Sequence, residues 1–252
     1  MDARPHSSGQ NQEDRFPSTR WSIVLSAGAV GVEKREEARA ALESLCQTYW
    51  LPLYAFIRRR TPHAEDARDL TQEFFTKLIS GRLLEVAHPD RGRFRSLLLT
   101  AAKNFLTNEW ERAGAEKRGG RRTPLSLDFE RAESQYAAIA ADTASAEQLF
   151  ERQWAIQLLD TVLSRLAQEW SQSGRSRDFE LLKPLLVGDC EALGGSPAVA
   201  RRLGISADAC RAAVYRMRKR YRKLLREEIA QTVCSEEEAT EELAALFRAF
   251  ES

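Results

Sequence analysis

The chain has 252 residues, of which 43% are hydrophobic and 30% are charged, and its formal net charge is +1. This composition lies within the range of globular proteins and excludes a collagen-like or low-complexity chain. With only 13 glycines and 8 prolines, a turn-rich β fold is disfavoured, so we predict an all-α protein. The length is enough for one large domain or two small ones.

The cysteines and histidines exclude the common metal sites. The four cysteines (Cys46, Cys190, Cys210 and Cys234) do not have the spacing of metal ligands, and there are only three histidines. We therefore predict no metal and no cofactor. No apolar run is long enough to cross a membrane, and the first 14 residues are polar without a signal-peptide core. We expect a cytoplasmic protein with reduced thiols and no membrane partner.

The first half of the chain is predicted to be a helical domain after a short polar tail. Residues 1–15 are predicted to be disordered, and residues 16–113 to form the domain. Apolar residues recurring every three or four positions predict its main helices, over 34–60, 64–79 and 93–112. The stripe of the first helix is Leu42, Leu45, Tyr49, Leu53 and Phe56. Pro52 lies within this helix and predicts a kink or a brief break.

The second half is predicted to be a linker, a second domain and a tail. Residues 114–146 form the linker, in which the alanine-rich stretch 137–146 favours some helix. Residues 147–233 form the second helical domain, with helices at about 147–170, 176–187, 197–203 and 207–230. Residues 234–252 form an amphipathic C-terminal extension with a helix at about 236–249.

The order of capping, proline and glycine residues within 196–208 predicts a helix-turn-helix. Ser196 is the expected N-cap, and Pro197 occupies the first helical position, where its missing N–H costs nothing. Gly204 supplies the positive φ of a tight turn, and Ser206 caps the next helix. The angle between the two helices is expected to be filled by Leu203 and Ile205. The core face of the second helix is expected to be Cys210, Val214, Met217, Tyr221 and Leu224.

Basic residues are concentrated in this second helix, and acidic residues at the end of the chain. From Arg201 to Arg226 there are ten basic residues and one acid, whereas Ser235 to Ser252 contains six acids and one base. A partner responds to the local potential more than to the net charge. We therefore predict that the helix at 207–230 reads DNA, with its first residues at base edges and its later cations at phosphates.

Three segments together resemble a sigma factor of the extracytoplasmic-function type, which is group 4 of the sigma-70 family. Residues 66–75, DARDLTQEFF, resemble region 2.2 of these factors. Residues 94–112, from Phe94 through Lys103-Asn104 to Asn108 and Arg112, resemble regions 2.3 and 2.4. The helix-turn-helix resembles region 4.2. The resemblance covers most of residues 38–230, and it implies a region 2 bundle and a region 4 helix-turn-helix domain joined by a linker.

The resemblance also implies partners and site residues for transcription initiation. Region 2.2 would dock on the β′ coiled coil of core RNA polymerase through Asp66, Asp69, Leu70, Gln72, Glu73 and Phe75. The −10 promoter element would meet Lys103, Asn104, Asn108, Arg112, Lys117 and Arg118. The −35 element would meet Ser206, Ala207, Asp208, Arg211, Tyr215, Arg216, Arg218 and Arg220. The remaining implied partners are the β flap of the polymerase and an anti-sigma factor or a kinase.

Several alternatives stay open from the sequence. Thr71 is a hypothetical phosphorylation site. The acidic tail helix would pack either as a plain terminal helix on the second domain or on the basic helix, which it would hold closed. The competing function is a stand-alone helix-turn-helix repressor or activator, whose first domain would have a closed apolar pocket or a dimer seam. No phosphate-binding glycine loop, metal spacing or nucleophile elbow favours an enzyme.

Overall fold

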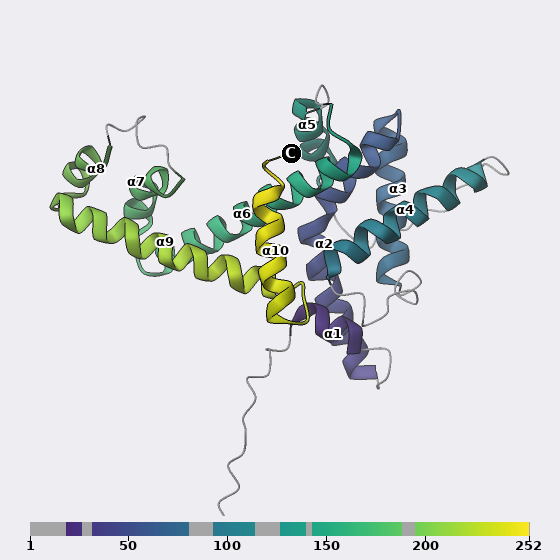
Figure 1. The fold of residues 1–252 in the computed structure, drawn as a ribbon, viewed down its shortest axis with the longest axis horizontal. Coiled ribbons are helices and arrows are strands. Elements are labelled where there is room, and N and C mark those ends of the chain that lie inside the picture. The colour runs from purple at the N-terminus through teal and green to yellow at the C-terminus, as the bar shows by residue number, and fades with distance from the viewer. Residues whose placement is uncertain are drawn as a thin grey trace, which may run out of the picture.

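The computed structural model describes residues 19–26, 32–80, 93–113, 127–139, 143–187 and 195–251. Within these ranges the chain forms helices and no strand, which confirms the predicted all-α fold. The helices, labelled in Figure 1, are α1 (Arg20–Ser26), α2 (Val32–Arg60), α3 (Ala64–Ile79), α4 (Phe94–Ala113), α5 (Phe129–Ile139), α6 (Ala146–Gln172), α7 (Ser176–Val187), α8 (Gly195–Leu203), α9 (Ala207–Ala230) and α10 (Glu236–Arg248).

Helix α2 is the centre of the first half of the chain, because α1, α3, α4, α5 and α6 all contact it. The apolar stripe predicted for it is buried throughout, at Leu42, Leu45, Tyr49, Leu53 and Phe56. The prediction at Pro52 was a kink or a brief break; the helix continues through Pro52, which excludes the break. A proline removes one backbone hydrogen bond from a helix, and here the helices packed around α2 hold the chain in place despite that loss.

Helix α5 lies inside the segment predicted to be a linker, and it begins before the alanine-rich stretch that favoured a helix. It packs on α2 through aromatic contacts. The Phe129 ring lies 5.5 Å from the Tyr54 ring, and the Arg58 guanidinium lies 4.9 Å from the centre of the Tyr136 ring. The last part of the predicted linker is therefore attached to the core around α2.

Helix α6 connects the two halves of the molecule. Ser145 and Gln148 form a capping box at its start, a device that satisfies two backbone amides at once. The first half of α6 packs on α2, where the Phe150 and Phe56 rings lie 6.4 Å apart. Its second half contacts α7 and α9. One long helix thus links α2 to α7 and α9 within one continuous hydrophobic core.

The two ends of the long axis carry different elements. Figure 1 shows α7, α8 and the start of α9 at one end, while α4 extends towards the other. The end of α9 returns to the centre of the molecule, where it meets α10. Ser235 caps α10 by accepting a hydrogen bond from the Glu238 amide at 3.2 Å. The helix-turn-helix therefore projects away from α2 and its neighbours.

Candidate nucleic-acid and protein interfaces

Helices α8 and α9 are joined by the predicted tight turn. Gly204 has φ +68°, a backbone conformation that glycine adopts without strain. The Ile205 amide donates to the Ala200 carbonyl at 3.0 Å, and the Ala209 amide donates to Ser206 Oγ at 3.1 Å. These bonds fix the turn and the start of α9, so the backbone of a helix-turn-helix is in place.

The structure differs from the prediction in two respects near the turn: the exposure of one side chain and the start of α8. Ile205 is 39% exposed, so the prediction that it fills the angle between the helices is wrong. It follows Gly204 outside both helices, where no helix surface covers it. Helix α8 begins at Gly195, one residue before the predicted cap Ser196. The core below the turn is formed by Val199, Ala200, Cys210, Val214 and Met217.

Of the residues predicted to meet the −35 element, some are exposed without a partner, and others interact within the protein. Tyr215 is 65% exposed and Arg216 is exposed, and neither has a hydrogen bond or an ion pair within the described ranges. Arg211 and Asp208 are also exposed, but they form an ion pair with each other. Ser206 uses its hydroxyl as the cap of α9, and Ala207 is half-buried beside it.

Arg218 and Arg220 are engaged within the protein. Arg218 Nη2 donates to the Leu185 carbonyl in α7 at 2.7 Å. Arg220 Nε donates to Glu169 Oε2 in α6 at 2.8 Å. This hydrogen bond raises the pKa of the Arg220 guanidinium and lowers the pKa of the Glu169 carboxyl. Both arginines therefore hold α9 to its neighbours, and each would have to give up its partner to make the predicted contact with DNA.

Other exposed cations around the helix-turn-helix were not among the predicted site residues. No ion pair or hydrogen bond occupies their side chains in the described part of the chain. They are Arg201 and Arg202 in the last turn of α8, and Lys219, Arg222 and Arg226 along α9. The sequence contains the necessary information, because Arg222 lies seven residues after Tyr215 and Arg226 four residues after Arg222, which places them on the same side of the helix as Arg211 and Tyr215. The free cationic surface is thus longer than the turn itself.

Helix α3 presents an acidic face. Asp66, Asp69 and Glu73 are exposed, while Leu70 and Gln72 are half-buried beside them. Glu73 forms an ion pair with Lys77 in the same helix at 2.7 Å. Apolar positions flanked by exposed acids are the arrangement expected of a surface that docks on a basic partner.

Two residues of α3 that were predicted to act at the surface are buried. Phe75 has no exposed surface and its ring lies 5.6 Å from Phe74, so it belongs to the core in this structure and presents no surface to a partner. Thr71 is also fully buried, and its hydroxyl donates to the Ala67 carbonyl at 2.7 Å. Because the Thr71 hydroxyl is buried here, the structure gives no support to the phosphorylation hypothesis.

Helix α4 carries the residues predicted to meet the −10 element. Asn104 and Asn108 are exposed, and an amide can donate and accept at a base edge. Lys103 forms an ion pair with Glu147 at 3.0 Å, and Arg112 forms one with Glu109 at 3.0 Å. The other two predicted residues, Lys117 and Arg118, lie outside the described residues.

Glu147, in the first turn of α6, links two cations of the first half of the chain. Its carboxylate lies 3.0 Å from Lys103 Nζ and 2.6 Å from Arg60 Nη2. Burial alone would raise the pKa of this carboxyl, but the hydrogen bond from Lys103 and the charge of Arg60 hold the pKa below its usual value. The anion is therefore favoured at neutral pH, and Lys103 is partly neutralised by α6.

Trp110 on α4 is a surface residue that the sequence analysis missed. It is 48% exposed and lies two helical turns beyond Lys103 on the same flank. An exposed tryptophan offers a flat apolar surface on which an unstacked base can rest. The seven-residue spacing from Lys103 was the available signal, and it was visible in the sequence.

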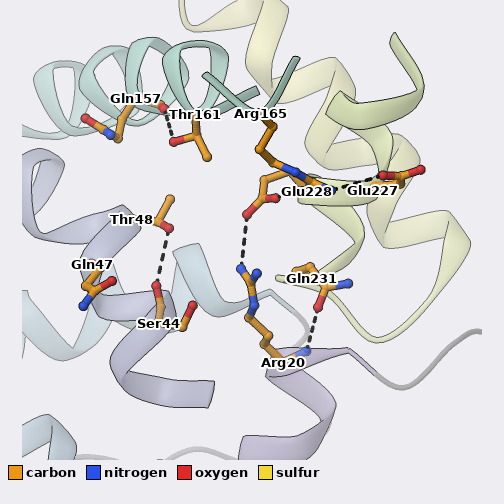
Figure 2. Close-up of a pocket in the computed structure, with 10 residues that line it drawn as sticks. All are labelled: Arg20, Ser44, Gln47, Thr48, Gln157, Thr161, Arg165, Glu227, Glu228 and Gln231. Carbon is orange, nitrogen blue, oxygen red and sulfur yellow. Dashed lines mark hydrogen bonds and ion pairs between the residues drawn. The ribbon is translucent and has the colours of Figure 1, made fainter. Parts of the chain in front are cut away.

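A cavity of about 770 Å³ lies between α1, α2, α6 and α9. Figure 2 shows that its walls are mainly hydroxyl, amide and charged side chains. Arg20 Nη1 and Arg165 Nη1 both donate to Glu228, at 3.2 Å and 2.8 Å (Figure 2). Because these charged side chains already pair with one another and the lining is polar, the cavity does not resemble the closed apolar pocket of a ligand sensor.

Across the described ranges, no three or more histidine, cysteine, aspartate or glutamate side chains are grouped so as to hold a metal ion. None of the described helices is both long enough and apolar enough to cross a membrane.

Comparison with known proteins identifies one domain. Residues 45–116 match the family model of sigma-70 region 2. No curated protein matches the chain, and no solved structure matches it. The matched residues include most of the buried stripe of α2, the acidic face of α3 and the exposed amides of α4. The chain therefore contains a sigma-70 region 2 domain.

Proposed function

We propose that the protein is a sigma factor of the extracytoplasmic-function type, which binds core RNA polymerase and directs transcription initiation in the cytoplasm. The observation that carries this proposal is the region 2 domain at residues 45–116 on the same chain as a helix-turn-helix with exposed cations. A stand-alone regulator would account for the helix-turn-helix, but it gives no reason for a region 2 domain. The polar lining of the cavity in Figure 2 also argues against a ligand-sensing first domain.

The acidic face of α3 is the proposed polymerase contact. We assign it to Asp66, Asp69, Leu70, Gln72 and Glu73, and to the β′ coiled coil as partner. The exposed acids supply long-range attraction to a basic surface, and the half-buried Leu70 supplies an apolar contact. The helix-turn-helix domain would contact the β flap, and an anti-sigma factor would compete for these surfaces.

Promoter DNA is the proposed second partner. Asn104, Asn108 and Lys103 on α4 would read the −10 element, with Trp110 as a stacking surface for an unpaired base. Tyr215 and Arg216 on α9 would reach the −35 element, and the exposed cations that follow them would contact phosphates.

Co-purification with core RNA polymerase tests this function. The wild-type chain is expected to bind core polymerase, and Asp69→Lys is expected to weaken that binding at least about tenfold, because like charges would then face each other. Glu236→Lys is the matched control, since Glu236 is also an exposed acid but lies on α10 and not on α3. A wild-type chain that does not bind core polymerase would overturn the proposal.

A further inference from the structure

The inner face of α10 is bonded to the start of α4. Glu242 has no exposed surface, and its two oxygens accept hydrogen bonds from Nε and Nη2 of Arg95, each at 2.9 Å. Arg93 adds a hydrogen bond to Glu242 at 3.2 Å and an ion pair to Glu241. Within the described ranges, no acid of α10 pairs with a cation of α9. Of the two arrangements considered from the sequence, the one in which the tail covers the basic helix is therefore not observed.

The opposite side of α10 carries a stripe of side chains that the protein leaves largely uncovered. Phe247 is 61% exposed, and Phe250, in the turn after the helix, is 49% exposed. Leu243 is half-buried one turn before Phe247, and Thr240 is exposed before Leu243. These four residues, called the outer stripe here, recur at intervals of three and four residues, which is the spacing of the contact seam between two paired helices. The outer stripe is therefore a surface that a second helix fits.

The charges beside the outer stripe are arranged so that two copies of α10 complement each other. Glu237 and Arg248 are both exposed, and neither has an ion pair in the described part of the chain. They are eleven residues apart, close to three helical turns, so they lie on the same flank of the helix. Glu237 comes six residues before Leu243, and Arg248 comes five residues after it. In an antiparallel pair centred on Leu243, each arginine therefore faces the glutamate of the other copy, whereas a parallel pair places like charges together.

We propose that the outer stripe of α10 binds the same stripe of a second copy of this chain, as an antiparallel helix pair centred on Leu243. The interface is isologous, so each contact occurs twice. The two Leu243 side chains meet at the symmetry axis, and Phe247 of each copy packs against Thr240 of the other. The apolar surface of the stripe is thereby removed from water.

Charge favours a second copy over other occupants of this face. A basic helix of another protein would meet Glu237 near one end of α10, but it would be repelled by Arg248 near the other. An anionic membrane surface would be repelled by the exposed acids Glu236, Glu237 and Glu241. A second copy of α10 carries both signs of charge at matching distances from the centre, so both ends of the pair are satisfied.

The length of α10 limits the strength of the pair. A helix of 13 residues is about 20 Å long. One such helix pair buries less than the roughly 1,200 Å² of a stable complex, so we expect weak and rapidly reversible association. None of the residues proposed to contact polymerase or DNA lies on α10. The pairing does not use those surfaces, and this inference does not depend on the proposed function.

Sedimentation velocity of the full-length chain tests the pairing. Between about 1 and 200 μM chain, the weight-average sedimentation coefficient is expected to rise from that of a monomer towards that of a dimer. Phe247→Glu is expected to raise the dissociation constant at least about tenfold, because it places a charge within the apolar stripe. Ile205→Glu is the matched control, since Ile205 is also an exposed apolar residue but lies at the turn between α8 and α9. A wild-type chain that stays monomeric over this range, or an equal effect of both variants, would refute the proposal.

Cysteine cross-linking tests the direction of the pair. In the antiparallel arrangement, Leu243→Cys places two thiols at the symmetry axis, where a disulfide can form. Phe250 lies seven residues after Leu243, so Phe250→Cys places the two thiols about 21 Å apart along the pair, too far for a disulfide. The wild-type chain under the same oxidising conditions gives the background from the native cysteines. Disulfide-linked dimers are expected from Leu243→Cys alone. Dimers from Phe250→Cys, or from neither variant, would contradict the antiparallel pair.

Discussion

Helices α4 and α9 both carry polar residues proposed to read DNA, but they differ in how many of their cations are already in ion pairs. On α9, Arg216, Lys219, Arg222 and Arg226 are exposed and have no ion pair in the described structure. On α4, Lys103 and Arg112 are each paired with a glutamate. These four charges of α9 are thus available to DNA at once, whereas those of α4 must first exchange their partners. This difference predicts that the helix-turn-helix supplies most of the affinity for duplex DNA in the free chain.

The largest expected effect concerns the base of α4. Arg95 is buried against Glu242 and lies over the Trp154 ring at 4.4 Å. Arg95→Ala should lower the free energy of unfolding by about 3 kcal/mol, because the buried Glu242 would lose both hydrogen bonds from Arg95 and keep the one from Arg93. Denaturant unfolding measures this change. Arg93→Ala, at a more exposed position, should cost clearly less, and equal losses for the two variants would argue against a buried ion pair as the anchor of α4.

The next effect separates two arginines of α9. Arg216 is exposed without a partner, while Arg220 is bound to Glu169. Arg216→Ala should weaken duplex DNA binding by about 1–3 kcal/mol, the usual value of a base-edge contact. Arg220→Ala should leave affinity close to wild type and lower the melting temperature instead. Fluorescence anisotropy with a labelled duplex, together with thermal unfolding, distinguishes the two variants. The reverse pattern would contradict the pairing of Arg220 with Glu169.

A smaller effect tests whether Glu147 restrains α4. Glu147→Gln removes the anion that pairs with Lys103 and should tighten binding of single-stranded DNA by about 0.5–1 kcal/mol, the value of a half-exposed ion pair. Glu130→Gln makes the same charge change at an exposed site on α5. An equal gain in both variants would mean that net charge, and not the release of Lys103, is responsible.

The smallest effect is a dependence of stability on pH. The hydrogen bond from Arg220 places the pKa of Glu169 in the folded protein below its ordinary value of 4.5. This pair therefore stabilises the fold fully above pH 4.5, and its contribution is lost as the pH falls through the lowered pKa. Because both side chains are half-exposed, the contribution should be below about 1 kcal/mol. The difference in melting temperature between wild type and Glu169→Gln should shrink in acid, and a constant difference would contradict the pairing.

The sequence predicts helices well here because their causes are local. The period of apolar residues places α3 and α9 at their observed bounds, Ser206 caps α9, and Gly204 marks the turn by itself. The sequence pattern does not decide whether Phe75 and Thr71 are buried or exposed, since both lie beside the apolar stripe of α3. The partners of Arg220 and Glu242 lie far away in sequence, so only the packing of α6, α9 and α10 determines them.

Run-off transcription tests the central claim most directly. Core RNA polymerase is supplied with the full-length chain and with duplex templates selected by binding to it. The account predicts discrete transcripts that require the chain, are reduced by Asp69→Lys, and lose their promoter preference with Arg216→Ala. Transcription that is the same with and without the chain, although the chain binds the polymerase and the template, would contradict the account.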